Sequence, residues 1–283
     1  MKYYSIPHMK IIDTHIHLFD TTRPQGVPYP SRDNAVLWKP ALPARYRELA
    51  SPLGITGAVA VEASPWLEDN LWLLEACATD KFMLGAIGNL EPEKPEFCEY
   101  LDRFLKNPIF RGIRYGNLWG RSLRQAVETH AFVDGVKYLA QSGLSLDTAN
   151  PDHELLEAVV RLSDKVPELR IVIDHLPNAM AQLKDHSMLR EIGKRPRIFL
   201  KVSEVIQKQG ADLKNYKRML DHMWELFGED RLMFGSDWPN WDTHAPLAEI
   251  VGLAKAYVLP KGDTVADKFF WKNSVAAYRW VQR

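Results

Sequence analysis

Two short segments near the two ends of the chain carry the residue types best suited to chemistry. The first is I-D-T-H-I-H at 12–17, and the second is F-G-S-D-W at 234–238. His15 and His17 lie two residues apart on an expected strand, so both rings point to the same face. Asp237 follows a second apolar run at its C-terminal end. If the segments meet, two imidazoles and a carboxylate can hold a metal ion, activate a water molecule, or do both.

Other polar side chains follow the remaining apolar runs of the sequence. In a barrel of parallel strands the catalytic groups come from the C-terminal strand ends. Charged groups are also costly to bury unless they are paired. We therefore expect a further set of strand-end residues to line the same site: Glu62, Asn89, Arg114, Asp147, His175, and Lys201 with Ser203.

Each assignment has a structural alternative. The histidines can be core residues bonded to backbone carbonyls, and Asp237 can cap the segment that follows it. Arg114 can form an ion pair with Glu62 or Asp147, and Lys201 has the same ambiguity. These alternatives stay open at the level of the sequence.

Strand alternation sorts the neighbouring residues. It turns Asp174 away from the face of His175, and Asp13 is likewise expected to point away from the site, which leaves both a supporting role. Glu204 directly follows the seventh run, and its role is not predicted. The remaining histidines lie in helix-like or loop-like segments and receive no role: His130, His153, His186, His222 and His244.

The elements that must position these groups alternate along the whole chain. Near-continuous apolar runs, typical of parallel strands buried on both faces, are expected at 11–17, 57–62, 82–90, 110–115, 144–148, 170–175, 197–203 and 231–237. Amphipathic segments, which predict helices, lie at 44–50, 68–79, 95–106, 123–141, 153–164, 179–192, 212–227 and 246–258. Eight strand–helix cycles predict an α/β fold, a (β/α)8 TIM barrel that forms a single domain over 1–283.

Three segments lie outside the strand–helix cycles. Residues 1–10 form an N-terminal extension, and the Pro- and Arg-rich segment 20–42 is expected to be a loop over the active site. Residues 262–283 are expected to form a C-terminal helix that packs across the barrel.

Composition excludes several classes of protein. The chain is 46% hydrophobic and 25% charged, with a formal net charge of +0, so nothing favours nucleic acid or a membrane surface as partner. We find no signal peptide or membrane span, which makes the cytoplasm the expected location. Two cysteines give no disulfide framework. Nothing indicates an oligomeric state.

The motifs resemble those of the amidohydrolase superfamily, and more closely its amidohydrolase-2 branch. The resemblance rests on D-T-H-I-H at 13–17, I-D-H-L at 173–176, K-V-S at 201–203 and F-G-S-D-W-P at 234–239. It therefore spans the whole chain. The branch includes sugar-lactone hydrolases, pyrone-dicarboxylate hydrolase and galactarolactone isomerase.

The resemblance also bears on metals. Binuclear members have a carboxylated lysine or a glutamate at strand four and histidines at strands five and six. Here those strands offer Arg114, Asp147 and only His175, so a binuclear centre is not expected. Asp147 also departs from the zinc decarboxylases, which have a histidine there. The resemblance implies no required cofactor, or one divalent ion, zinc first, on His15, His17 and Asp237.

The predicted function is hydrolysis of a small lactone, a sugar-acid or carboxylated one. Asp237 would activate water, and His15, His17 and His175 would polarise the ring carbonyl. The predicted substrate-binding residues are Arg114, Lys201, Glu62, Asp147, Trp119 and Trp238. The alternatives are a lactone isomerase, a mononuclear-zinc decarboxylase or amidohydrolase, and a sugar-acid binder without catalysis.

Overall fold

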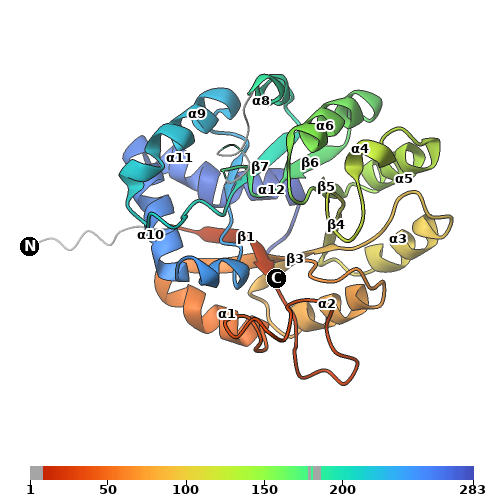
Figure 1. The fold of residues 1–283 in the computed structure, drawn as a ribbon, viewed down its shortest axis with the longest axis horizontal. Coiled ribbons are helices and arrows are strands. Elements are labelled where there is room, and N and C mark those ends of the chain that lie inside the picture. Colours follow the sequence, from red (N-terminus) through yellow and green to blue (C-terminus); the bar gives the residue numbers. More distant parts are fainter. Residues whose placement is uncertain (1–8, 178–179, 181–185) are drawn as a thin grey trace, which may run out of the picture.

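One parallel sheet, in which the eight strands follow sequence order, forms the centre of the molecule (Figure 1). The computed structural model describes residues 9–177, 180 and 186–283. Each strand begins and ends close to its predicted apolar run: β1 (Ile11–His17), β2 (Ile55–Val61), β3 (Met83–Gly88), β4 (Phe110–Arg114), β5 (Ser145–Asp147), β6 (Arg170–Ile173), β7 (Ile198–Val202) and β8 (Leu232–Phe234).

The sheet closes between its first and last strands. His17 N donates to Trp238 O at 2.7 Å, and Asp237 N donates to His15 O at 2.9 Å. These two bonds join the end of β1 to the segment that follows β8, and the predicted (β/α)8 barrel of one domain is confirmed. They also bring the two chemistry-bearing segments of the sequence side by side through the backbone alone.

Helices surround the barrel (Figure 1). The described α-helices are α1 (Pro43–Ala50), α2 (Asp69–Ala78), α3 (Phe97–Leu105), α4 (Leu123–Ala126), α5 (His130–Gln141), α6 (His153–Lys165), α8 (Ser187–Gly193), α9 (Lys217–Phe227), α10 (Leu247–Val258), α11 (Asp263–Asp267) and α12 (Asn273–Tyr278). Shorter helical turns are η1 (Ser51–Leu53), η2 (Leu213–Asn215), η3 (Asn240–Thr243), η4 (Leu259–Lys261) and the π-helical η5 (Lys268–Lys272). The helix predicted at 179–192 lies partly outside the described residues.

Local capping explains where one predicted helix divides. The segment 123–141 forms two helices, because the Thr129 hydroxyl accepts a hydrogen bond from Phe132 N and so starts α5 as an independent helix. In the same way Asp152 Oδ1 accepts from Leu155 N at 2.8 Å and starts α6.

The hydrophobic core has two layers. The larger layer lies between the sheet and the helices, and the smaller one fills the barrel with residues such as Ile12, Val59, Val172 and Met233. The C-terminal segment closes the amino end of the barrel. Predicted as one helix over 262–283, it forms α11, η5 and α12 and leaves the helical conformation after Tyr278, which joins the inner core.

The segment 20–42 leaves β1 and returns to α1 over the carboxyl ends of the first strands. Its base is fixed by paired backbone bonds between Phe19 and Ala41, at 3.1 and 2.8 Å. Farther out, Arg23 Nη2 lies 2.6 Å from Asp69 Oδ1 on α2, and its guanidinium lies 5.0 Å from the ring centroid of Trp72. Among the described residues, no helix has both the length and the apolar character that crossing a bilayer requires.

Candidate active site

A shift of register in β1 between Asp13 and Ile16 sets the positions of the two histidines. The Asp13 side chain points out of the barrel, as predicted, but for another reason: strict alternation would put residues 13, 15 and 17 on one face, and the register shift separates Asp13 from the two histidines. The Asp13 carboxylate accepts hydrogen bonds from the Tyr46 hydroxyl at 2.6 Å and from Ser236 N at 2.9 Å. Asp13 therefore ties β1 to the turn that carries Asp237.

His15, His17 and Asp237 converge on one point. The Nε2 atoms of His15 and His17 lie 3.1 Å apart, and Asp237 Oδ1 lies 3.6 Å from the first and 3.2 Å from the second. None of the three residues is more than 3% exposed. The contacts that the described residues make with the Asp237 carboxylate, from the Asn240 amide and the two imidazoles, all fall on Oδ1. Oδ2 is thus the oxygen that remains for a bound molecule.

His175 completes the group through an unusual backbone. Its φ angle is 53°, in the left-handed region, as are those of Glu204 (54°) and Asp237 (61°). At these three residues the backbone departs from ideal strand geometry, and the side chains point to the barrel mouth. Left-handed residues of this kind are often found at functional sites. His175 Nδ1 lies 3.0 Å from Ser203 Oγ and 3.3 Å from Glu204 Oε1.

Asp174 lies inside the barrel, so the prediction that alternation turns it away was wrong. The strand pattern places Val172 in the inner core, and Asp174 follows on the same face. His175 reaches the site only because its left-handed φ angle breaks the alternation. Asp174 Oδ1 lies 2.9 Å from Lys201 Nζ and 3.6 Å from His15 Nδ1.

Lys201 lies inside the barrel, with Nζ 3.2 Å from His15 Nδ1. Its side chain is 0% exposed, and its ammonium group donates to Asp147 Oδ2 at 2.7 Å. The Tyr278 hydroxyl donates to the same oxygen at 2.7 Å. The structure therefore places both Lys201 and Asp147 in an internal ion-pair network, contrary to the substrate-binding role that the sequence favoured for them.

Arg114 and Glu62 form the ion pair that the sequence left open. Arg114 Nε donates to Glu62 Oε1 at 2.7 Å, and its Nη2 donates to the Glu62 carbonyl at 2.8 Å. Trp119 Nε1 donates to Glu62 Oε2 at 3.1 Å, as does Ser64 N at 2.9 Å. Trp119 therefore lies beside the site, held by the same carboxylate.

Trp238 does not line the site. The residue is 1% exposed, and its ring packs against Tyr46 at 5.0 Å and beneath the Arg45 guanidinium at 5.1 Å. It packs between β8 and α1, because its backbone carbonyl binds His17 N and turns the side chain outward.

Burial dominates the electrostatics of the site. It lowers the pKa of His17 to about 3 and the pKa values of His15 and His175 well below the ordinary value, so all three imidazoles are neutral. Burial also raises the pKa of Asp237 well above the ordinary carboxyl value, although the nearby Arg114 opposes this. The pKa of Asp147 rises to about 6 for the same reason, against the effect of Lys201.

The residues present fit one divalent metal ion. His15, His175 and Asp237 each bring one ligand atom to within 4.8 Å of the others. A tetrahedral zinc site with bonds of 2.0–2.1 Å separates its ligand atoms by about 3.3–3.4 Å. The distances of 3.1, 3.2 and 3.6 Å among His15, His17 and Asp237 lie close to this value.

The second ring nitrogens of His17 and His15 bear on whether these residues can bind a metal ion. His17 Nδ1 donates to the Val61 carbonyl at 3.0 Å, which leaves a lone pair on Nε2. Metal-binding histidines usually donate their other nitrogen to a carbonyl or carboxylate in this way. For His15, Asp174 Oδ1 lies 3.6 Å from Nδ1, which is longer than a hydrogen bond, and the same oxygen lies 2.9 Å from Lys201 Nζ.

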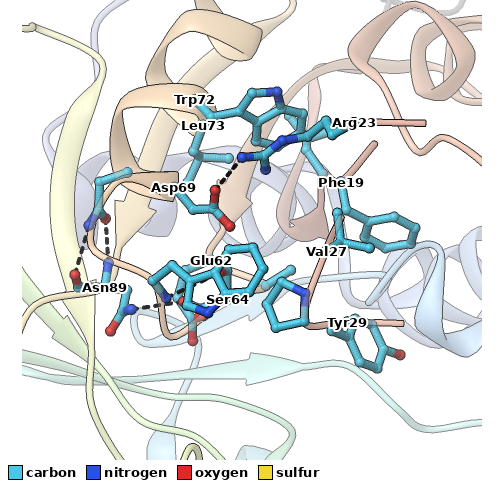
Figure 2. Close-up of a pocket in the computed structure, with 15 residues that line it drawn as sticks. Phe19, Arg23, Val27, Tyr29, Glu62, Ser64, Asp69, Trp72, Leu73 and Asn89 are labelled. Atoms are coloured by element: carbon cyan, nitrogen blue, oxygen red, sulfur yellow. Dashed lines mark hydrogen bonds and ion pairs between the residues drawn. The ribbon is translucent and has the colours of Figure 1, made fainter. Parts of the chain in front are cut away.

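A pocket adjoins this site over the ends of β1, β2 and β3. Figure 2 shows it between the segment 20–42 and α2, with the Arg23–Asp69 ion pair on its upper wall. Its lining combines aromatic rings with polar strand-end groups: Phe19, Tyr29, Trp66, Trp72, Glu62, Ser64 and Asn89. The lining thus offers both apolar faces and hydrogen-bonding groups, and the free space of about 20 Å³ that it encloses has room for a water molecule.

Sequence reasoning missed three residues of the site. Asp174 was misplaced by strict alternation, which the left-handed residue after it invalidates. Tyr29 lies in a loop whose path no local pattern reveals. Asn240 follows the G-S-D-W-P motif by one residue, and that proximity to Asp237 was the available signal.

Comparisons with known proteins show the family and the fold of the chain. Residues 12–280 match the family model described as Amidohydrolase (Amidohydro_2). An L-fucono-1,5-lactonase of Burkholderia ambifaria is 25% identical over 235 residues, 81% of this chain and 80% of that protein. An L-fucono-1,5-lactonase of Burkholderia multivorans is 23% identical over 281 residues, 94% of both. A crystal structure of a Burkholderia multivorans amidohydrolase with bound zinc is 21% identical, covers 96% and 99% of the two chains, and has a TM-score of 0.84.

Proposed function

The chain belongs to the amidohydrolase-2 family, and we propose that it is a hydrolase that opens a small sugar-acid lactone. One observation carries the proposal. A buried carboxylate with a raised pKa, Asp237, is held through Oδ1 beside three neutral imidazoles, while Oδ2 remains for a water molecule. The names of two relatives, both L-fucono-1,5-lactonases, support the choice of a lactone.

In the proposed reaction Asp237 acts first as a base and then as an acid. Oδ2 takes a proton from water, and the water oxygen bonds to the ring carbonyl carbon. The bond between that carbon and the ring oxygen then breaks. Asp237 returns the proton to the ring oxygen, which gives an open hydroxy acid. The raised pKa suits the first step, because a stronger base takes the proton from water more readily.

Only some of the imidazole nitrogens can stabilise the oxyanion that forms in this reaction. His17 donates through Nδ1 to Val61, so its Nε2 accepts and cannot donate to an oxyanion. His15 Nδ1 lies 3.2 Å from the Lys201 ammonium, which donates to it. With Nδ1 so occupied, His15 carries its proton on Nε2, where His17 Nε2 accepts it at 3.1 Å. We assign this N–H to the carbonyl oxygen when a lactone is bound, in exchange for the bond to His17.

A single divalent ion would be held by His15, His17 and Asp237, with His175 beside them. When bound, such an ion supplies a bound water of lowered pKa and polarises a carbonyl. The site also contains more buried carboxylates than cations, since Glu62, Asp147, Asp174 and Asp237 face only Arg114 and Lys201. A divalent cation would balance this excess.

The ion pairs favour a neutral sugar lactone over a carboxylated one. Arg114 is bound to Glu62, Lys201 to Asp147 and Asp174, and Arg23 to Asp69. In the described part of the site, each cation is therefore already paired with a carboxylate. A substrate carboxylate would have to compete with these internal partners and would add to the acidic excess.

The testing experiment is a pH-indicator hydrolysis screen with purified protein. It compares neutral sugar-acid lactones with carboxylated pyrone lactones, with and without a chelator, beside the variant Asp237→Asn. We expect acid release from sugar lactones that is lost in the variant. Absence of acid from every lactone would refute the proposal, and reaction in ¹⁸O-water separates hydrolysis from isomerisation, in which no label enters the product.

A further inference from the structure

The segment 20–42 reaches the candidate base through two hydrogen bonds. The Tyr29 hydroxyl donates to Asn240 Oδ1 at 2.9 Å, and Asn240 Nδ2 donates to Asp237 Oδ1 at 3.2 Å. Tyr29 also lines the pocket that adjoins the site, and Figure 2 shows it on the same side of the pocket as Phe19 and Val27. Tyr29, in the segment 20–42, is thus linked to the Asp237 carboxylate through the Asn240 amide.

We propose that Asn240 and Tyr29 are positioning residues, which together fix the plane of the Asp237 carboxylate so that Oδ2 faces the bound lactone. The inference rests on the proposed function, because it assigns the orientation of the proposed base. Neither residue touches the reacting atoms. Both act through Asp237.

The Asn240 amide gives the chain of bonds a direction. Its oxygen can only accept and its NH₂ group can only donate, so Tyr29 must donate to the oxygen and Asp237 must accept from the nitrogen. Burial, with Asp237 as a further contributor, raises the pKa of Tyr29 to about 12, so the hydroxyl keeps its proton at neutral pH. The donor at the head of the chain is therefore constant.

A second contact is needed to fix a carboxylate that can rotate about its Cβ–Cγ bond. His17 Nε2 lies 3.2 Å from Asp237 Oδ1, but its lone pair cannot donate to that oxygen. Asn240 Nδ2 is the described side-chain donor within hydrogen-bond distance of Asp237. Without it, Oδ1 and Oδ2 would have little to distinguish them.

The position of Tyr29 is itself determined by the fold. Its ring meets the edge of Phe19, at a centroid distance of 5.9 Å, and Phe19 is bonded to Ala41 at the base of the loop. Arg23 and Asp69 fix the loop to α2 on the other side of the pocket. The orientation of the base is therefore coupled to the placement of the segment 20–42.

The test uses Asn240→Ala, Tyr29→Phe and the double variant, with the lactone that reacts fastest in the screen. Loss of a hydrogen bond to a charged group corresponds to about a 10–100-fold fall in kcat for Asn240→Ala, with KM within about twofold. Tyr29→Phe acts only through Asn240, so we expect a smaller fall. The double variant should match Asn240→Ala, because the two residues form one chain.

Tyr257→Phe is the matched control. It also removes a tyrosine hydroxyl that binds a partner, Asp221 at 3.1 Å, but on α10 and away from the site. We expect its kcat to equal that of the wild type. Wild-type kcat in Asn240→Ala and Tyr29→Phe, or effects that add in the double variant, would overturn the inference.

A crystal structure of Asn240→Ala separates this inference from the proposed function. If the wild type opens no lactone, the proposed function fails. The positioning role of Asn240 is then tested by the orientation of the Asp237 carboxylate in the variant. Rotation of the carboxylate about Cβ–Cγ in the variant supports the positioning role. An unchanged carboxylate in the variant refutes it.

Discussion

Replacing Lys201 by Met should destabilise the protein strongly, because it leaves two buried carboxylates without their cation. Lys201 Nζ lies 2.7 Å from Asp147 and 2.9 Å from Asp174, and all three side chains are 0% exposed. Removing one partner of a buried ion pair typically costs about 3–5 kcal/mol. Methionine fills a similar volume, so a cavity adds little to this cost.

The expected change in melting temperature follows from the size of the chain. An unfolding entropy of about 2.1 cal/mol/K per residue gives about 0.6 kcal/mol/K for 283 residues. The free-energy loss then corresponds to a fall of about 5–8 °C. Urea unfolding measures the free energy, and differential scanning calorimetry measures the melting temperature.

The pH dependence of Lys201→Met checks the cause. Lys201 lowers the pKa of Asp147, so its removal raises that pKa further above the value in the unfolded chain. A carboxyl with a raised folded pKa binds more protons when folded, and stability therefore falls as pH rises through the window between the two values. The deficit should be smaller at pH 5 than at pH 8.

Two outcomes would refute this reasoning. One is a variant within about 1 kcal/mol of the wild type, and the other is a deficit that does not change with pH. The double variant Lys201→Met with Asp147→Asn removes one of the stranded charges. The double variant should recover part of the lost free energy of unfolding. If it recovers none, the loss in Lys201→Met comes from packing instead of from unpaired charge.

Three further predictions concern the site. The kcat/KM for lactone hydrolysis should rise with pH through the raised pKa of Asp237, so a pH–rate profile that stays flat down to pH 5 would exclude it as the base. His17→Ala should weaken binding of Co²⁺ by at least about tenfold, measured by competition with a fluorescent chelator, because it removes an available Nε2 lone pair; equal affinity excludes His17 as a ligand. Trp238→Phe should lower the free energy of unfolding by about 1–3 kcal/mol and leave KM unchanged, whereas a raised KM would mean that the ring contacts substrate.

Periodic features of the fold could be predicted from the sequence. Runs such as 11–17 and 170–175 are apolar because parallel strands are buried on both faces, and the same rule placed His15, His17 and Asp237 at strand ends. Closure of the barrel then brings residues 222 positions apart in the chain, such as His15 and Asp237, into contact.

Residues that break periodicity could not be placed in this way. His175 and Asp237 have left-handed φ angles, and no rule of alternation applies beyond such a residue. The error for Asp174 has this origin. Ionic partners were equally hidden, since Arg114 had two candidate carboxylates and the choice of Glu62 depends on the distance between strand ends.

The role of Lys201 differs most from the prediction, because Lys201 contacts His15 inside the barrel instead of binding substrate. His15 Nδ1 lies between a donor, Lys201 Nζ at 3.2 Å, and an acceptor, Asp174 Oδ1 at 3.6 Å. A bond from Lys201 puts the imidazole proton on Nε2, where it can serve an oxyanion, whereas a bond to Asp174 frees Nε2 to ligate a metal. The same three side chains thus support either form of the site, and the exchange needs a proton shift on one ring without a change in fold. The excess of buried carboxylates favours the metal-bound form, and the contacts that keep Lys201 Nζ beside His15, at 2.7 Å from Asp147 and 2.9 Å from Asp174, favour the metal-free one.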